Sequence, residues 1–227
     1  MAIVIKKAAK IDDRVKTVNP VYGCSLNPPC PYCYMQSMNR RFHITPDFSV
    51  PTEMPQALKK FNTRIPTNFF FTSASDMADY TPEYRDLVFD TMLKYHRNSY
   101  LFLTKRPKKC NFDCTLANIW AGVTITSSGD KSRLQDIKNV CQANHYWVCF
   151  EPVLGDIGQI NLDKVDWIVI GAETGNRVGK VVPQKDWILN IVNQAKKRGI
   201  PLYMKDSLFD IVGKDEFLQE FPTKDFN

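Results

Sequence analysis

Short runs of apolar residues recur along the chain, separated by stretches in which apolar residues return every three or four positions. Runs with the length and composition of strands lie at 17–22, 68–72, 99–104, 119–124, 146–151, 167–171 and 202–205. Helical spacing is found at 32–42, in a helix that begins after Thr81, at 131–143 and at 184–198. Strands that alternate with helices in this way predict a parallel sheet with crossover helices.

Residues at the helix ends support these boundaries. Thr81 is a favourable N-cap, Pro82 suits the first helical position, and Gly199 is the residue expected after the last helix. The helix after Thr81 is predicted to present an apolar face of Tyr84, Leu87, Val88, Met92 and Tyr95. Residues 44–66 contain several prolines, so they are predicted as a connection with one short helix over 56–61.

The number of strand–helix units limits the architecture. Six or seven units in 227 residues are enough for a partial barrel, whereas a complete eight-fold barrel typically needs about 250 residues. We therefore predict an α/β fold, a partial (β/α)6-type barrel with parallel strands, formed by one domain over residues 1–227. Residues 1–16 are expected to form an N-terminal arm or strand, and residues 206–227 a C-terminal extension.

Composition is that of an ordinary globular protein, with 44% hydrophobic and 24% charged residues. No apolar run approaches the length of a membrane span, and no signal peptide is recognised, so we expect a cytoplasmic protein with no membrane partner. The formal net charge is +6, with basic residues gathered at 105–109 and 196–198. This charge permits a phosphate-bearing partner without requiring one, since a modest excess often belongs to a solvated face.

Three cysteines lie within ten residues, at Cys24, Cys30 and Cys33, with the spacing C-x5-C-x2-C. Thiolates at this spacing suit an iron–sulfur cluster, and the lack of a fourth local cysteine would leave one iron open. Structural zinc is the alternative, with His43 as the fourth ligand. A disulfide is disfavoured because the seven cysteines are an odd number and a cytoplasmic protein is expected.

The ends of the predicted strands are unusually polar. In parallel α/β folds the reacting groups collect at the carboxyl ends of strands, so these residues are predicted to line a pocket. They are Ser73, Ser75, Asp76, Thr104, Lys105, Arg106, Thr124, Thr126, Glu151, Glu173, Lys205 and Asp206. Structural alternatives remain open: Asp76 as a turn cap, Glu151 and Lys205 as an internal pair, and Arg106 as a surface contact.

The other four cysteines are predicted to have different surroundings. Cys149 alternates with Trp147 and Glu151 and so shares a strand face with a pocket residue. It is either a hydrogen-atom donor to a substrate radical or a small buried hydrophobe. Cys141 is assigned to the core, and Cys110 and Cys114 to a loop without a nearby third ligand.

The cysteine motif, with Tyr32 directly before its last cysteine, resembles that of radical S-adenosylmethionine (SAM) enzymes, whose usual spacing is C-x3-C-x2-C. A resemblance over nearly the whole chain is to the phage Gp37/Gp68 family, which shares a three-cysteine motif and has no secure substrate. It is carried by Asn19-Pro20, Gly23-Cys24, Ser73-Ala74-Ser75-Asp76, Leu103-Thr104-Lys105-Arg106-Pro107, Asn118-Ile119-Trp120-Ala121-Gly122-Val123, Glu151-Pro152-Val153-Leu154-Gly155, Asp166-Trp167-Ile168-Val169-Ile170-Gly171-Ala172-Glu173-Thr174-Gly175 and Pro201-Leu202-Tyr203-Met204-Lys205. That family usually has Trp before the Asn-Pro and Gly-Gly-Glu-Ser-Gly at 171–175.

The resemblance implies a radical SAM enzyme with a [4Fe–4S] cluster on Cys24, Cys30 and Cys33. Its open iron would chelate SAM, and reductive cleavage would give a 5′-deoxyadenosyl radical acting on an unknown substrate, with a nucleotide or nucleic acid among the candidates. An electron donor such as flavodoxin or ferredoxin is implied. Catalytic roles are expected for Glu151, Lys205 and Cys149, and cofactor contacts for Tyr32, Ser73, Ser75, Asp76, Arg106, Thr124 and Glu173. The alternative is a non-catalytic, zinc- or cluster-stabilised nucleic-acid-binding module.

Overall fold

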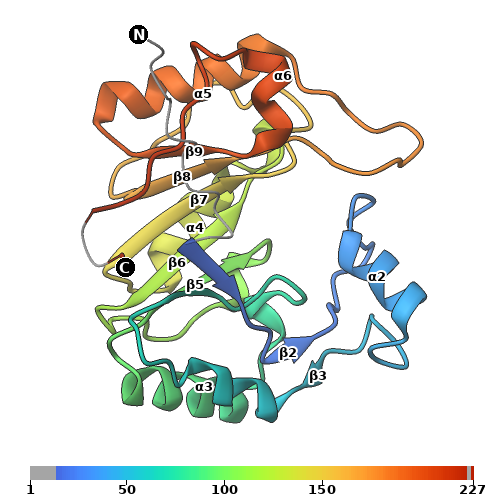
Figure 1. Cartoon of the computed structure of the whole chain (residues 1–227), viewed down its shortest axis with the longest axis vertical. Coiled ribbons are helices and arrows are strands. Elements are labelled where there is room, and N and C mark those ends of the chain that lie inside the picture. Colours follow the sequence, from blue (N-terminus) through green and yellow to red (C-terminus); the bar gives the residue numbers. More distant parts are fainter. Residues whose placement is uncertain (1–13, 224–225) are drawn as a thin grey trace, which may run out of the picture.

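The main sheet has seven parallel strands in the order β1-β4-β5-β6-β7-β8-β9, in a computed structural model that describes residues 14–223 and 226–227. The strands are β1 (Val15–Thr17), β4 (Asn68–Phe70), β5 (Ser99–Thr104), β6 (Ile119–Thr124), β7 (His145–Phe150), β8 (Trp167–Ile170) and β9 (Leu202–Met204). All six pairings are parallel, and Figure 1 shows the sheet curling between helices. The predicted α/β half-barrel with parallel strands is confirmed.

Helices connect most of these strands. They are α2 (Tyr34–Phe42), α3 (Pro82–Lys94), α4 (Ser132–Val140), α5 (Lys185–Arg198) and α6 (Phe209–Val212). The 3₁₀ helices are η1 (Pro55–Phe61), η2 (Met77–Asp79), η3 (Pro107–Lys109), η4 (Ser128–Asp130) and η5 (Asp206–Leu208). Thr81 caps α3 by accepting a hydrogen bond from the Tyr84 backbone N–H, and Gly199 ends α5 in the left-handed conformation, both as predicted.

The first predicted strand, at 17–22, is wrong as a single element. It is divided between β1, which pairs with β4, and β2 (Val21–Tyr22), which pairs antiparallel with β3 (Thr52–Glu53) in a separate sheet. Asn19 and Pro20 cause the break, because Pro20 lacks an N–H for a ladder and the Asn19 side chain accepts hydrogen bonds from Ser73 Oγ and Ala74 N, both at 3.0 Å. The chain therefore turns out of the main sheet immediately before the cysteine motif.

Smaller differences concern the helices and the chain ends. The short helix near residue 56 is the 3₁₀ helix η1, and Leu87 on α3 is exposed rather than part of its buried face. Most of the arm expected for residues 1–16 lies outside the described residues, and its last part contributes to β1. No helix in the described part of the chain is both long and apolar enough to pass through a bilayer.

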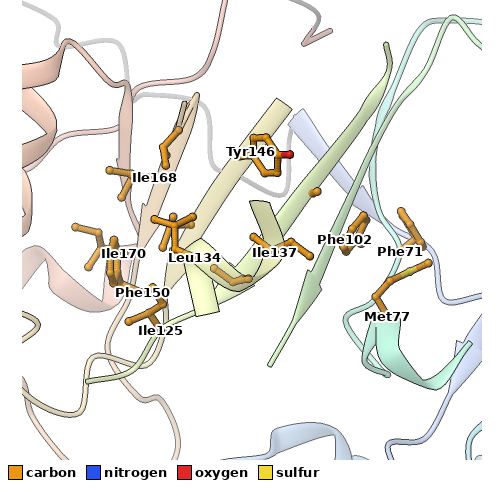
Figure 2. Close-up of a cluster of buried hydrophobic side chains, with 14 of the residues drawn as sticks. Phe71, Met77, Phe102, Ile125, Leu134, Ile137, Tyr146, Phe150, Ile168 and Ile170 are labelled. Carbon is orange, nitrogen blue, oxygen red and sulfur yellow. The ribbon is translucent and has the colours of Figure 1, made fainter. Parts of the chain in front are cut away.

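Alternating side chains along the strands build two apolar layers. The outer layer, between the sheet and the helices, includes Phe71, Phe102 and Phe150 from the sheet and Leu134 and Ile137 from α4 (Figure 2). This continuous core fixes the relative positions of the strand ends, because close-packed interiors resist displacement of their elements.

The inner layer closes one end of the half-barrel. Trp120, Trp147 and Trp167 lie near the amino ends of their strands and pack with Phe226 in one buried cluster. The terminal residue Asn227 continues this cover, since its backbone N–H donates to Asn68 Oδ1 at the start of β4 at 2.9 Å. The carboxyl ends of the strands are left as the open end.

Candidate active site at the carboxyl ends of the strands

A cavity of about 590 Å³ lies at the carboxyl ends of the strands, between the sheet and the cysteine loop. Most of the site residues predicted from sequence line it: Cys24, Cys30, Tyr32, Cys33, Ser73, Ser75, Asp76, Thr104, Lys105, Thr124, Cys149, Glu151, Glu173, Lys205 and Asp206. Arg106 and Thr126 are not among the lining residues. The structure thus brings residues from distant parts of the sequence to one cavity, as expected for a parallel sheet.

The cysteine loop is fixed to its surroundings at its first residues. Gly23 N donates to Ala74 O at 2.9 Å, and Cys24 N donates to Phe48 O at 2.8 Å. Gly23 has φ of +108°, and a Cβ there would lie 2.8 Å from Val50 O, so both conformation and space require glycine. The loop ends in a turn in which Cys33 N donates to Cys30 O, and Cys33 is the N-cap residue of α2.

A buried ion pair braces the loop beside Cys24. Arg106 Nη2 lies 2.6 Å from Asp79 Oδ2, and Arg106 Nη1 donates to Ser25 Oγ at 2.8 Å. Ser25 in turn donates through its backbone N–H and its hydroxyl to the Asp79 carboxylate. Burial alone would lower the pKa of Arg106, but Asp76 and Asp79 raise it, so the guanidinium stays charged. Arg106 is the N-cap residue of η3. Through Ser25 and Asp79 it therefore connects η3 to the cysteine loop.

The three loop thiols are partly exposed and form no disulfide. Burial raises the pKa of Cys24 to about 12, so this thiol is protonated until a metal displaces its proton. No three His, Cys, Asp or Glu side chains within residues 14–223 and 226–227 are grouped so as to hold a metal ion. Iron–sulfur clusters are bound by cysteine thiolates, each on a different iron of a four-iron cluster, so the three thiols that line the cavity have the donor chemistry of such a cluster.

His43 does not approach the thiols. It is the C-cap residue of α2, whereas Cys33 is the N-cap residue. The two are separated by the whole helix, about 15 Å at the usual rise per residue. The zinc site predicted as an alternative, with His43 as the fourth ligand, is therefore contradicted by the position of this residue.

Asp76 is buried, and both oxygens of its carboxylate accept hydrogen bonds from the protein. Oδ1 accepts from Ala78 N at 2.9 Å and from Thr104 Oγ1 at 2.6 Å, and Oδ2 accepts from Lys105 N at 2.8 Å. These bonds make Asp76 the N-cap of η2 and tie β5 to the loop after β4. The turn-cap role considered from sequence is thus present, at a residue that also lines the cavity.

Glu151 and Lys205 form an ion pair inside the cavity, with Lys205 Nζ 2.7 Å from Glu151 Oε2. Burial alone would lower the pKa of Lys205, but Glu151 raises it, with smaller contributions from Cys149 and Tyr34, and the net shift is upward. Lys205 is therefore a cation across the physiological range. A Cβ on Gly171 would lie 2.9 Å from Glu151 Oε1, so glycine makes room for this carboxylate.

Cys149 lies beside Glu151, with its Sγ 3.7 Å from Glu151 Oε2. It shares the inner face of β7 with Trp147, as the alternation predicted. Burial raises the pKa of Cys149, and Glu151 adds to the effect, so the group is a thiol and not a thiolate. An S–H bond thus faces the cavity beside an ion pair.

Glu173 lies at the rim of the cavity and is held by a neighbour. Arg177 donates to both of its carboxylate oxygens, through Nη2 to Oε2 at 2.8 Å and through Nε to Oε1. These bonds hold the pKa of Glu173 below its usual range. Arg177 also donates to Val178 O and Gly179 O, so the pair organises the loop that projects after β8 (Figure 1).

Further lining residues add polar groups and one ring. Lys105 Nζ lies 5.9 Å from the centroid of the Tyr32 ring, which brings a cation to the cysteine loop. Burial raises the pKa of Tyr32, with a further contribution from Cys30, so its hydroxyl keeps its proton. Ser73 donates to Asn19 Oδ1, which leaves the oxygen of this hydroxyl able to accept a hydrogen bond.

Sequence reasoning missed four residues that matter here, namely Ser25, Asp79, Tyr34 and Tyr203. Ser25 and Asp79 form the brace, while Tyr34 and Tyr203 line the cavity. Asp79 carried a weak signal, because it follows Asp76 by three residues and so lies on the same side of a 3₁₀ turn. Tyr34 carried another, since it directly follows the last cysteine of the motif.

Comparison with known proteins places the chain in a family. It belongs to the family described as protein of unknown function (DUF5131), whose model matches residues 8–209. No curated protein matches the chain. The name phage Gp37/Gp68 stays a prediction.

Among solved structures, the chain is similar to a mutant of spore photoproduct lyase with bound AdoMet and dinucleoside spore photoproduct. The sequence identity is 12% and the TM-score is 0.42, over 80% of this chain and 61% of that chain. The chain therefore spans about three fifths of the length of that protein.

Proposed function

We propose that this protein is a radical SAM enzyme that holds a [4Fe–4S] cluster on Cys24, Cys30 and Cys33. The observation that carries the proposal is that three thiols of one loop line the same cavity as a half-buried ion pair and a protonated thiol. Three protein ligands on a four-iron cluster leave one position for a small molecule, which is the arrangement of catalytic rather than structural metal sites. When bound, the reduced cluster supplies the electron that cleaves SAM.

The chain's own residues would bind and orient the two reactants. The Ser73 hydroxyl oxygen is available to accept a hydrogen bond from an ammonium group such as that of SAM. Ser75, Asp76, Thr124 and Glu173 are proposed to complete the cofactor side of the cavity together with Tyr32. Arg106 was expected to contact the cofactor directly, and we now propose that it acts by holding Ser25 and hence Cys24.

The opposite side of the cavity is proposed to receive the substrate. Lys205 is a cation there at physiological pH and would orient an anionic or strongly polar group of the substrate, while Glu151 would accept a hydrogen bond from a donor group of the substrate. Cys149 keeps its proton and would donate a hydrogen atom from its S–H bond to a substrate radical. Flavodoxin or ferredoxin remains the proposed class of electron donor, and the cytoplasm the proposed compartment.

The experiment is an anaerobic assay of the whole chain. Protein reconstituted with iron and sulfide should be brown, with broad absorption near about 400 nm. With dithionite and SAM it should form 5′-deoxyadenosine, measured by mass spectrometry, and a Cys30→Ala variant prepared in parallel should form none. Iron-loaded protein that yields no 5′-deoxyadenosine with several reductants would overturn the proposal. A colourless protein carrying one zinc would support a non-catalytic binding module instead.

A further inference from the structure

Helix α2 carries large apolar side chains that face solvent. Tyr34, Met38 and Phe42 are 61%, 40% and 54% exposed. They are spaced four residues apart, so they lie along one side of the helix over about 12 Å. Figure 1 shows α2 set apart from the main sheet, at the side where the cysteine loop lies.

The helix is attached to the protein by other contacts. Asn39 is its buried residue, and the Asn39 side chain bonds to the backbone N–H and the carbonyl of Thr45 at 2.9 and 3.0 Å. Met35 packs against the small cluster of Tyr22 and Phe48. The row of Tyr34, Met38 and Phe42 is therefore not needed to hold α2 in place, although exposed apolar side chains in a contiguous row usually mark a binding surface.

The segment of the chain that carries this row has charged side chains of one sign. Residues 14–46 contain no Asp or Glu, and their charged side chains are Arg14, Lys16, Arg40 and Arg41. Arg40 and Arg41 lie in the last turn of α2, and the Arg41 guanidinium carbon is 5.1 Å from the centroid of the Phe42 ring. Exposed rings interleaved with arginines suit the bases and phosphates of a nucleic-acid strand.

The row is also continuous with the cavity. Tyr34 is both the most exposed of the three side chains and one of the residues that line the cavity. Lys105 and Lys205 bring two cations to the cavity, whose lining also contains the carboxylates of Asp76, Glu151, Glu173 and Asp206. Asp76, Glu151 and Glu173 each accept a bond from a cation or a backbone N–H, and Asp206 Oδ1 accepts one from Gln219 Nε2.

We propose that α2 is the docking surface for single-stranded nucleic acid, and that the substrate of the enzyme proposed above is a nucleotide within such a strand. The chemistry at the substrate nucleotide rests on the function proposed above, whereas the binding of a nucleic-acid strand to α2 does not. A flexible strand can stack successive bases on Tyr34 and Phe42, place phosphates against Arg40 and Arg41, and turn one nucleotide into the cavity. An acidic electron-transfer protein could also bind to Arg40 and Arg41. It would give no role, however, to a row of exposed rings that extends from Phe42 to Tyr34 at the cavity.

The test is the affinity of the full chain for fluorescent single-stranded DNA and RNA of about twelve nucleotides, measured by anisotropy. Phe42→Ala should weaken binding about ten-fold, the effect of losing one stacked base. Leu93→Ala is the matched control, because Leu93 on α3 is also 54% exposed and should leave affinity unchanged. Arg41→Ala should reduce the slope of log affinity against log salt by about one.

No binding of either oligonucleotide at about 50 mM salt, or equal losses in Phe42→Ala and Leu93→Ala, would overturn the proposal. It would also be overturned if Phe42→Ala slowed cluster reduction by flavodoxin and left oligonucleotide affinity unchanged, since α2 would then dock the electron donor. Formation of 5′-deoxyadenosine is measured on the same samples. Binding without SAM cleavage would refute only the enzyme, and cleavage without binding would refute only this surface.

Discussion

Six of the cysteines form two groups of three, which differ in exposure and in position relative to the cavity. Cys24, Cys30 and Cys33 are partly exposed, lie in one loop and line the cavity. The other group, Cys110, Cys114 and Cys141, is 0% exposed and belongs to the apolar layer outside the sheet. Access to a ligand therefore distinguishes the groups, since only the first meets a space that a cofactor can enter.

The surroundings of the two groups explain the difference. The first group follows a break in the main sheet, where Gly23 and Cys24 bond to neighbouring loops and Arg106 braces Ser25. Burial raises the pKa of Cys110 to about 12, which keeps this thiol uncharged among apolar neighbours. Polar bonds position one group, and hydrophobic packing positions the other.

The largest expected effect separates the groups directly. Cys24→Ala, Cys30→Ala and Cys33→Ala should each lose most of the bound iron, because each removes one of three cluster ligands. Cys110→Ala, Cys114→Ala and Cys141→Ala should keep their iron and lose about 1 kcal/mol of folding free energy from the vacated core space. Iron analysis and thermal melting of all six variants make the measurement.

A different result would change the comparison. If Cys30→Ala retained near-normal iron, the loop group would not be the ligand set. If a variant of the buried group lost its iron and kept the melting temperature of wild type, that group would take part in metal binding despite its burial. The six variants are controls for one another, because each replaces one thiol by the same side chain.

Much of this site could be expected from sequence because parallel strands bring their ends together. The positions of Glu151, Lys205, Cys149 and the loop cysteines at one cavity follow from strand alternation and topology. The partners of Asp76 and Arg106 could not be foreseen, because they depend on how 3₁₀ turns aim side chains across loops. The break at Asn19 was hidden by the apolar residues on both sides of it.

An intermediate effect is expected from the brace of the cysteine loop. Arg106→Met should destabilise the protein by about 3–5 kcal/mol, because it leaves the buried Asp79 carboxylate, 3% exposed, without its cation. It should also reduce iron content, since Ser25 loses its partner next to Cys24. Arg106→Lys should recover part of the stability and part of the iron content. Arg85→Met is the matched control, because it removes an ion pair with the exposed Asp86.

Melting temperature, iron content and SAM affinity of these variants distinguish the brace from a cofactor contact. A fall of about 10 °C in Arg106→Met with parallel loss of iron supports the brace. Unchanged melting and iron with weakened SAM binding would instead return Arg106 to the cofactor role first expected for it. That result would also show that Cys24 is held well enough by its bond to Phe48.

The smallest expected effect concerns Cys149, which combines features of the two groups. It is 4% exposed, like the buried group, yet it lines the cavity, like the loop group. Cys149→Ala should retain iron and SAM cleavage and lower the melting temperature by about 2–4 °C, as expected for one small buried side chain. In D2O its thiol exchanges, so hydrogen that it donates appears as deuterium. Without added substrate, the 5′-deoxyadenosyl radical itself would take deuterium from the S–D bond, leaving a thiyl radical for the added dithionite to reduce. The 5′-deoxyadenosine formed by wild type should therefore contain a deuterated fraction that falls several-fold in Cys149→Ala, measured by mass spectrometry beside Cys141→Ala. Equal deuterium in all three proteins would assign Cys149 to core packing, and loss of iron would make it a ligand.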